Sequence, residues 1–425
     1  MSENANLPQA APEIPGLPAR NAALKLIDAV LRRGETLDAA ENGALRGVRE
    51  FADRALARAI AGEALRWLVD FDALIDSATK LRLADDAKPR MVLRLMLAQW
   101  LRLDTPPHAV VATALPLLMG GPKRLAHGVF ATLTREGATL PATPTLPPAV
   151  AERWGERAGA IAEGLALPPP LDLALRDPAA TAEWAATLGG TSLAPGHVRL
   201  ARGSAVESLP GFAEGAWWVQ DLAASLPARL LGEGAGPERQ LRVLDLGAAP
   251  GGKTLQLAAA GWAVTALDLS APRLKLLHEN LARTGLSAEV VNANALKWQP
   301  EAPFDAILID APCTATGTCR RNPDVLHRIG ERQIAEMADL QARLLARAAG
   351  WLAPGGRLVY AVCSLEPEEG EAQVARVPLT PDPIRADELP SGLAATPEGW
   401  LRTDPGMLAD AGGLDGFFVA RWRMD

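Results

Sequence analysis

The chain has few of the features that mark secreted and membrane proteins. Its 425 residues include three cysteines, at positions 313, 319 and 363, and none of them forms a C-x-x-C pair. Three cysteines are too few for a disulfide framework and indicate a reducing compartment. We therefore expect a cytoplasmic protein. No apolar run approaches the roughly 18 residues of a membrane span, and no basic, apolar leader opens the chain. We therefore expect neither export nor membrane insertion.

The chain also lacks a net positive charge, since 43 Lys and Arg stand against 50 Asp and Glu and the formal net charge is −7. Non-specific affinity for nucleic acids comes largely from Lys and Arg side chains that neutralise phosphates, so a strongly basic nucleic-acid-binding protein is excluded. The charge is unevenly spread, however. Residues 1–135 carry 18 Lys and Arg against 15 Asp and Glu, a net charge of +3, which leaves −10 for the remainder. The mildly basic first third is compatible with an RNA-binding role.

The first half of the chain predicts a helical domain between two segments without a core of their own. Residues 21–137 carry apolar side chains at three- and four-residue spacing, as in Val92, Leu93, Met96 and Leu97, which is typical of a bundle of five to seven helices. We expect residues 1–20, rich in Pro, Ala and Asn, to be a disordered tail. A Pro-rich stretch at 138–150 is followed by a short amphipathic segment and by three prolines at 168–170, and we interpret 138–170 as a linker between independently folding units.

The second half predicts an α/β domain. Residues 171–235 contain short strand-like pieces at 198–200 and 216–220, and we interpret them as a small mixed extension of the catalytic domain. From 236 to 425, apolar runs alternate with helical stretches; the runs are LRVLDLG, WAVTALDL, AEVVNA, FDAILID, GRLVYAVCS and GFFVARW. Such a pattern indicates a Rossmann-like, mostly parallel sheet with helices on both faces.

A glycine-rich run, DLGAAPGGKT at 245–254, joins the first of these strands to a helix. Glycines let the backbone approach a ligand closely, and the free N–H groups of a helix N-terminus suit a nucleotide-like ligand. The spacing matches neither G-x-G-x-x-G nor the phosphate loop G-x-x-x-x-G-K-[ST], so neither common nucleotide fingerprint is supported. The residues predicted to hold the ligand are Gly247, Ala248, Ala249, Pro250, Gly251, Gly252 and Lys253.

Two polar residues follow the next strands. Asp268 ends the second strand, 21 residues after Gly247, where a carboxylate can accept hydrogen bonds from ribose hydroxyls. The alternative is a solvated Asp that caps the following helix. Asn294 ends the third strand and can contact adenine through its amide, although a plain turn residue is nearly as common there. Together with the glycine run, these residues fit an adenosyl group.

The fourth and fifth strands each deliver a cysteine to the same edge of the sheet. DAPC ends the fourth strand at Asp310–Cys313, and VCS ends the fifth at Val362–Ser364. Ligands bind at the carboxyl edge of such sheets. A buried structural cysteine is the usual alternative for either thiol alone, but the joint placement favours chemistry. One reaction that requires a cysteine is the methylation of cytosine at C5. C5 is a poor nucleophile, and a thiolate that adds at C6 activates it for attack on the methyl donor. Asp310 would protonate or hydrogen-bond ring N3, and Cys313 would assist the final elimination.

These motifs resemble those of the Nop/Sun family of RNA cytosine-C5 methyltransferases, in the bacterial branch with a NusB-like N-terminal domain. The resemblance covers nearly the whole chain and includes AHGVFATLTRE at 126–136, WVQDLAASL at 218–226 and the closing DGFFVARW. It implies a seven-stranded methyltransferase domain at 236–425 and a NusB-like RNA-binding domain at 21–137. It implies S-adenosylmethionine as the cofactor, held by 247–253, Asp268, Asn294 and Asp310. It also implies that Cys363 is the nucleophile and that Cys313 promotes product release.

The resemblance further implies a cytosine in small-subunit (16S) ribosomal RNA as the target. We also expect no metal and a monomer. The sequence departs from the family at Asn294, where Asp is common, and at Val362, where Thr is frequent. Arg320 and Arg321 lie in a family-like loop and would meet RNA phosphate, with a solvated pair as the alternative; Cys319 has no assigned role. Three other functions stay open: a transfer-RNA cytosine-C5 methyltransferase, an inactive RNA-binding or ribosome-assembly factor, and, disfavoured by the missing fingerprint, a nicotinamide-dependent dehydrogenase.

Overall fold

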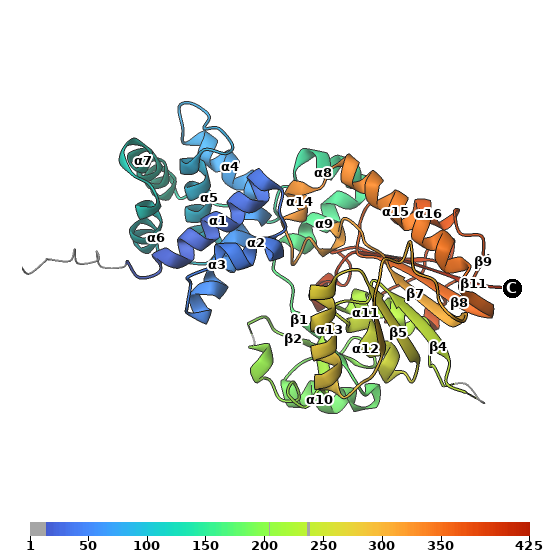
Figure 1. The fold of residues 1–425 in the computed structure, drawn as a ribbon. Coiled ribbons are helices and arrows are strands. Elements are labelled where there is room, and N and C mark those ends of the chain that lie inside the picture. The colour runs from blue at the N-terminus through green and yellow to red at the C-terminus, as the bar shows by residue number, and fades with distance from the viewer. Residues whose placement is uncertain (1–13, 204, 236–238) are drawn as a thin grey trace, which may run out of the picture. The chain divides into compact units, whose positions relative to one another are not determined.

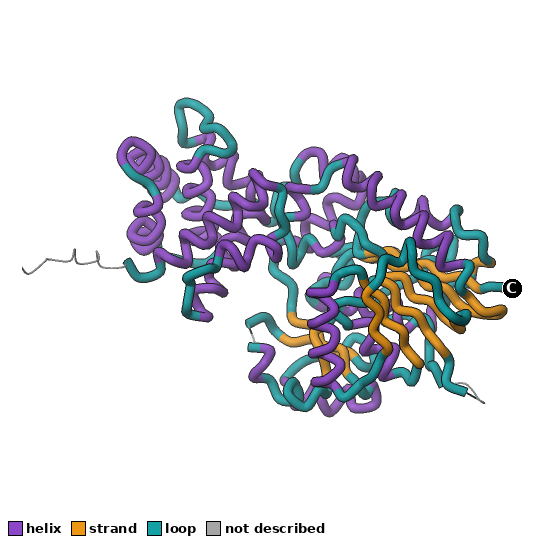
Figure 2. The backbone as a smooth tube through the Cα atoms, in the orientation of Figure 1, coloured by secondary structure: helices purple, strands orange, loops and turns teal. Residues whose placement is uncertain are grey.

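The computed structural model describes residues 14–203, 205–235 and 239–425. The chain separates into two compact units (Figure 1). The first contains the described residues up to Pro147 together with Asn322–Arg328, and the second contains Pro148–Arg321 and Ile329–Asp425. Figure 2 shows helices throughout the first unit, and both strands and helices in the second. Among the described residues, no helix combines the length and apolar character needed to cross a bilayer.

The first unit confirms the predicted all-α domain. Its helices before Pro147 are α1 (Leu17–Arg33), α2 (Leu37–Ala44), α3 (Phe51–Arg66), α4 (Leu68–Ser77), α5 (Lys88–Arg102), α6 (Pro107–Ala114) and α7 (Gly120–Glu136). Helix α1 begins inside the segment 1–20 that we expected to be a disordered tail, so that expectation is wrong for residues 17–20. Gly16 takes a left-handed conformation before the helix and Pro18 occupies its first turn, which is a favourable start. Residues 1–13 lie outside the described residues.

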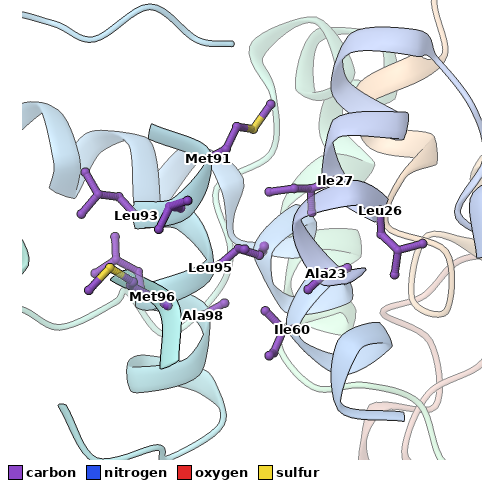
Figure 3. Close-up of a cluster of buried hydrophobic side chains, with 14 of the residues drawn as sticks. Ala23, Leu26, Ile27, Ile60, Met91, Leu93, Leu95, Met96 and Ala98 are labelled. Atoms are coloured by element: carbon purple, nitrogen blue, oxygen red, sulfur yellow. The ribbon is translucent and has the colours of Figure 1, made fainter. Parts of the chain in front are cut away.

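The core of this unit surrounds α5 (Figure 3). Every side chain from Arg90 to Gln99 is buried, because neighbouring helices pack around α5 on all sides. Leu95 and Met96 lie in one cluster with Ile27 of α1 and Ile60 of α3. A fully buried aliphatic side chain stabilises the fold by about 1.5–3 kcal/mol.

A short segment from much later in the chain completes this unit. Residues Asn322–Arg328 contain α14 (Val325–Arg328), whose Val325 and Leu326 side chains are buried. The ring Nε2 of His327 lies 2.7 Å from the backbone carbonyl oxygen of Leu65 in α3. The sequence pattern gave no indication that these residues pack with the helical unit.

The expected linker at 138–170 is partly folded, which corrects that prediction. It contains α8 (Pro148–Trp154) and α9 (Ala158–Leu165), and both belong to the second unit. Each helix buries an apolar face that includes Val150 and Trp154 in α8 and Ile161 and Leu165 in α9. Prolines lie near both ends of this stretch, at 141–148 and 168–170, but the apolar residues between them decide its structure.

The segment 171–235 contains a small antiparallel sheet. Its strands, in the order β2-β1-β3, are β1 (Leu171–Leu175), β2 (His197–Leu200) and β3 (Trp217–Val219). Strands β2 and β3 match the two predicted pieces, whereas β1 was not singled out. Helix α10 (Thr181–Leu188) lies between β1 and β2 in the chain.

The main sheet has the order β10-β11-β8-β7-β4-β5-β6. Its strands are β4 (Arg242–Leu246), β5 (Ala263–Asp268), β6 (Glu289–Asn292), β7 (Phe304–Asp310), β8 (Leu352–Val362), β10 (Leu401–Thr403) and β11 (Phe417–Arg423). The pairs from β6 to β8 are parallel, and β11 runs antiparallel to β8. This confirms the mostly parallel sheet. Six strands of this path match the apolar runs predicted from the sequence, whereas β10 was not singled out; the path has the seven strands that the resemblance implied, and β9 (Thr380–Pro381) adds a two-residue eighth strand beside β11. Position 236, where we expected this domain to begin, lies outside the described residues.

Helices cover both faces of this sheet. One apolar cluster joins the sheet to α11 (Leu222–Arg229), α12 (Gly252–Ala259) and α13 (Ala271–Thr284), and a second joins it to α15 (Glu331–Ala349). Successive residues of β4 point to opposite faces, so Val243 belongs to the first cluster and Leu244 to the second. The parallel strands therefore end together at one edge, where their connecting loops meet.

Candidate active site

A cavity of about 540 Å³ lies at the carboxyl edge of the parallel strands. Such a volume is typical of small-molecule sites. Of the residues predicted from the sequence, those that line it are Gly247, Asp268, Asn294, Asp310, Cys313 and Cys363. The remaining predicted cofactor residues, Ala248 to Lys253, do not line it. They form the turn and the first helical residues behind the cavity wall.

The first wall is the turn after β4. Gly247 has a φ of +83°, and a Cβ at this position would lie 2.1 Å from the carbonyl oxygen of Asp310. The backbone N–H groups of Gly247 and Ala248 donate to the carbonyl oxygen of Leu267, at 2.9 and 3.2 Å. Only glycine fits this close approach, so the turn crosses directly over the ends of β5 and β7.

Asp268 fastens this turn from the next strand. Its Oδ2 accepts a hydrogen bond from the N–H of Ala249 at 3.1 Å, and its Oδ1 accepts one from the N–H of Ser270 at 2.8 Å. Asn294 closes a local turn, because its Oδ1 accepts the N–H of Leu296 at 2.9 Å. Both side chains therefore have structural partners in addition to their place on the cavity wall.

The sequence analysis missed one apolar wall of the cavity. Leu269 lines it and is 69% exposed, although leucine is usually buried. It directly follows Asp268 at the end of β5, and this position was the available signal. A glycine turn, a carboxylate, an amide and an apolar side chain together fit an adenosyl group, whose ribose is polar and whose purine ring is flat.

Lys253 points toward the strand ends. Its Nζ donates to Oδ2 of Asp310 at 2.7 Å and lies 5.4 Å from the centre of the Phe417 ring. Burial alone lowers the pKa of a lysine, but the charge and hydrogen bond of Asp310 outweigh it, so the pKa of Lys253 is raised. The charge on Cys363 acts in the same direction. Lys253 is therefore an ammonium group paired with Asp310 and within electrostatic reach of Cys363.

The two predicted thiols lie side by side. The Sγ atoms of Cys313 and Cys363 are 3.4 Å apart, close enough for one S–H group to donate to the other sulfur. The hydrogen bond with Cys363, together with burial, raises the pKa of the Cys313 thiol well above its usual value. Cys313 therefore stays protonated while it lies beside Cys363.

The loop after Cys313 differs from its predicted role. Arg320 is only 2% exposed and donates to the carbonyl oxygen of Gly412, so it is neither an RNA contact at the surface nor a solvated side chain. Arg321 is half-exposed and forms an ion pair with Asp415. Cys319 is fully buried. Among the residues that the structure describes, no His, Cys, Asp and Glu side chains gather as a metal site would require.

Comparisons with known proteins agree with this architecture. Residues 235–423 match the family model described as 16S rRNA methyltransferase RsmB/F, and residues 17–119 match the NusB family. The chain is 34% identical to ribosomal RNA small subunit methyltransferase B from Klebsiella pneumoniae subsp. pneumoniae, over 95% of this chain and 97% of that protein.

Solved structures show the same fold. The chain is similar to a methyltransferase homolog protein from Pyrococcus horikoshii, with 27% identity and a TM-score of 0.54 over 69% of this chain and 98% of the other. It is also similar to NSun6 from Pyrococcus horikoshii, with 20% identity and a TM-score of 0.55 over 65% and 98%. The chain therefore belongs to the RsmB/F family of 16S rRNA methyltransferases, and its cofactor is S-adenosylmethionine.

Proposed function

We propose that the chain methylates C5 of a cytosine in small-subunit ribosomal RNA and that Cys363 is the nucleophile. The observation that carries the proposal is the pair of sulfur atoms 3.4 Å apart on the wall of the cavity. Methylation at a ring nitrogen or at a ribose hydroxyl needs no thiol. Methylation at C5 of a pyrimidine needs one thiol to form a bond and a group to remove a proton afterwards, and this site holds both.

The first step is the addition of the Cys363 thiolate to C6 of the base. An S–C6 bond forms, the electron pair of the C5–C6 double bond moves toward N3, and N3 takes up a proton. Asp310 and Lys253, joined at 2.7 Å, form the proton-donating pair for N3. The positive charge of Lys253 attracts the attacking thiolate electrostatically. The adduct leaves C5 rich in electrons, as a methyl acceptor must be.

When bound, S-adenosylmethionine supplies a methyl group on a positively charged sulfur. Gly247, Asp268, Leu269 and Asn294 are the residues that would hold its adenosyl part, because they form the wall beside the thiols. Asp310 lies between this wall and the cysteines, so it belongs to both halves of the site.

The last step removes the C5 proton and breaks the S–C6 bond, which restores the C5–C6 double bond and releases the Cys363 thiolate, while N3 returns its proton to the Asp310–Lys253 pair. Cys313 is the base for that proton. The largest cause of its raised pKa is the hydrogen bond with Cys363, and this bond is lost once the sulfur of Cys363 is bound to C6. The formation of the adduct therefore lowers the pKa of Cys313 when a base is needed.

The helical unit supplies a second contact with RNA. A groove of about 500 Å³ is lined by Lys25 of α1, Arg46 and Lys88 of α5, and none of the described residues that line it is a carboxylate. All three cations are exposed. Since the whole chain carries a net charge of −7, such a grouping of cations is a favourable place for RNA phosphates.

The test is a methylation assay on purified RNA with base-resolved detection of 5-methylcytosine. We expect wild-type protein and the control Cys319→Ala to produce 5-methylcytosine in 16S rRNA, and Cys363→Ala to produce none. Transfer RNA is assayed in parallel. Methylation of transfer RNA alone would reassign the substrate, and activity of Cys363→Ala at the wild-type level would end the proposal.

A further inference from the structure

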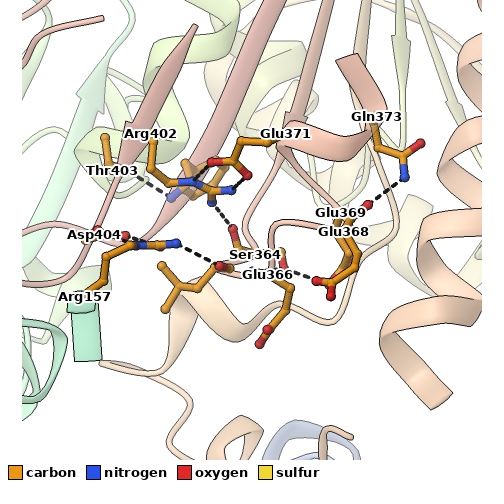
Figure 4. A network of polar contacts seen from close by, with 12 residues as sticks. Arg157, Ser364, Glu366, Glu368, Glu369, Glu371, Gln373, Arg402, Thr403 and Asp404 are labelled. Atoms are coloured by element: carbon orange, nitrogen blue, oxygen red, sulfur yellow. Dashed lines mark hydrogen bonds and ion pairs between the residues drawn. The ribbon is translucent and has the colours of Figure 1, made fainter. Parts of the chain in front are cut away.

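A buried carboxylate lies between the two turns that carry the thiols. Cys313 lies three residues after the end of β7, and Cys363 directly follows β8. Glu369, six residues after Cys363, is fully buried. Figure 4 shows its side chain directed toward Ser364 in the middle of a polar network. Neither the cofactor wall nor the chemistry proposed above uses this group.

Glu369 accepts hydrogen bonds from both turns. On the Cys313 side, its Oε2 accepts the N–H of Thr314 at 2.9 Å, and its Oε1 accepts the hydroxyl of the same residue. On the Cys363 side, its Oε1 accepts the hydroxyl of Ser364 at 2.7 Å. Thr314 and Ser364 each directly follow a cysteine, so one carboxylate holds the residue next to each sulfur atom.

Helix α15 adds a third attachment. The side-chain amide of Gln341 donates to Oε2 of Glu369 and to the carbonyl oxygen of Pro312, both at 2.9 Å. Pro312 directly precedes Cys313. The Cys313 turn is thus held on both sides of its cysteine, by Glu369 itself and by the amide that Glu369 orients.

The carbonyl groups of the Cys363 turn are held independently (Figure 4). Arg402 donates to the carbonyl oxygen of Ser364, and Arg157 donates to that of Leu365 at 3.2 Å. The N–H of Gly317 donates to the carbonyl oxygen of Cys363 at 3.0 Å. These bonds hold the backbone of the Cys363 turn, whereas Glu369 accepts a side-chain hydroxyl from each of the two turns.

The chemistry of the donors explains why a carboxylate is required. All four groups around Glu369 donate: one backbone N–H, two hydroxyls and one amide. An ionised carboxylate accepts at both oxygens, whereas a glutamine of the same shape would turn an NH₂ group toward donors on one side. Burial raises the pKa of Glu369, and its four hydrogen bonds act against that rise.

We propose that Glu369 is a positioning residue that sets the distance between the nucleophilic sulfur of Cys363 and the sulfur of Cys313. The inference builds on the proposed function, in which the first thiol forms the adduct and the second releases it. Glu369 touches neither substrate nor cofactor in this scheme and acts through Thr314 and Ser364.

The experiment compares Glu369→Gln with the matched control Glu368→Gln, the same change at the adjacent exposed side chain. We expect Glu369→Gln to lower kcat on the order of 100-fold, because a displacement of about 1 Å in reacting groups has that effect. The KM for S-adenosylmethionine should stay at the wild-type value, because Glu369 does not line the cavity. If Glu369→Gln fails to fold, Thr314→Val removes one of the hydroxyl bonds and serves instead. A folded variant with a lowered melting temperature and wild-type kcat would assign Glu369 a purely structural role.

A second measurement needs neither RNA nor turnover. Diamide, an azo oxidant, takes one hydrogen from each of two neighbouring thiols, which then form a disulfide. We expect Cys313 and Cys363 to couple in the wild-type protein and in Glu368→Gln, and at least about tenfold more slowly in Glu369→Gln. Coupling of Glu369→Gln at the wild-type rate would overturn the inference. Loss of methylation by the wild-type protein with this pattern intact would overturn only the proposed function.

Discussion

Gly247→Ala tests the geometry of the cofactor turn. The added methyl group would lie 2.1 Å from the carbonyl oxygen of Asp310, whereas an ordinary contact needs at least 3.4 Å. The turn and the end of β7 must therefore separate by about 1 Å, which costs on the order of 100-fold in rate, or about 3 kcal/mol. The left-handed φ adds about 1–2 kcal/mol of backbone strain.

Gly285→Ala is the matched control for this prediction. Gly285 ends α13 with a φ of +65°, and an added Cβ there meets nothing within 4 Å. Both variants carry the backbone strain, but only Gly247→Ala carries the clash. We expect calorimetry to show weakened binding of S-adenosylmethionine by Gly247→Ala alone, with a matching loss of methyl transfer. If both variants bind the cofactor equally well, the assignment of the turn is wrong.

Three further predictions concern Lys253, His327 and the cationic groove of the helical unit. Lys253→Met should lower kcat on the order of 10²- to 10⁴-fold while calorimetry gives an almost unchanged Kd for S-adenosylmethionine, because it removes the proton donor and not the cofactor wall. Burial lowers the pKa of His327 from 6.5 to about 4. Between pH 6.5 and 4, this imidazole therefore binds a proton in the unfolded chain but not in the folded protein. Over this pH range, the free energy of unfolding of the wild-type protein, measured in urea, should fall by on the order of 3 kcal/mol relative to that of His327→Gln, because the substitution removes only the contribution of this imidazole. Replacing Lys25, Arg46 and Lys88 by Ala should reduce the magnitude of the slope of log K for RNA binding against log salt concentration by about 2. An unchanged slope would contradict the role of the groove in RNA binding.

Much of the catalytic unit follows from local sequence patterns. Strands β4, β5, β7 and β8 are continuous apolar runs with turn residues at their ends, so their parallel pairing and common edge were predictable. Once the strands are parallel, Cys313 and Cys363 must come to the same edge. The positions of the two cysteines after these parallel strands therefore predicted that the thiols would be neighbours.

The features that sequence reasoning missed depend on distant contacts. Glu369 looks like one more acid in an exposed PEEGE run, and only the fold brings Thr314 and Gln341 against it. The loop around Arg320 has the composition of an exposed segment, but the Arg320 side chain is buried. The segment 322–328 packs with the helical unit although it follows the Cys313 turn in the chain. Local composition does not encode such pairings, because they depend on where remote segments meet.

The bond between the sulfur of Cys363 and C6 of the base can be detected on the protein itself. Cys313→Ala protein is incubated with 16S rRNA and S-adenosylmethionine, denatured, digested, and examined by mass spectrometry for a nucleotide-linked peptide. We expect a linked nucleotide that carries a methyl group, attached to the sulfur of Cys363, and no such adduct in the double variant Cys313→Ala/Cys363→Ala. A Cys313→Ala protein that turns over normally without any adduct, or an adduct on another residue, would contradict the covalent role of Cys363.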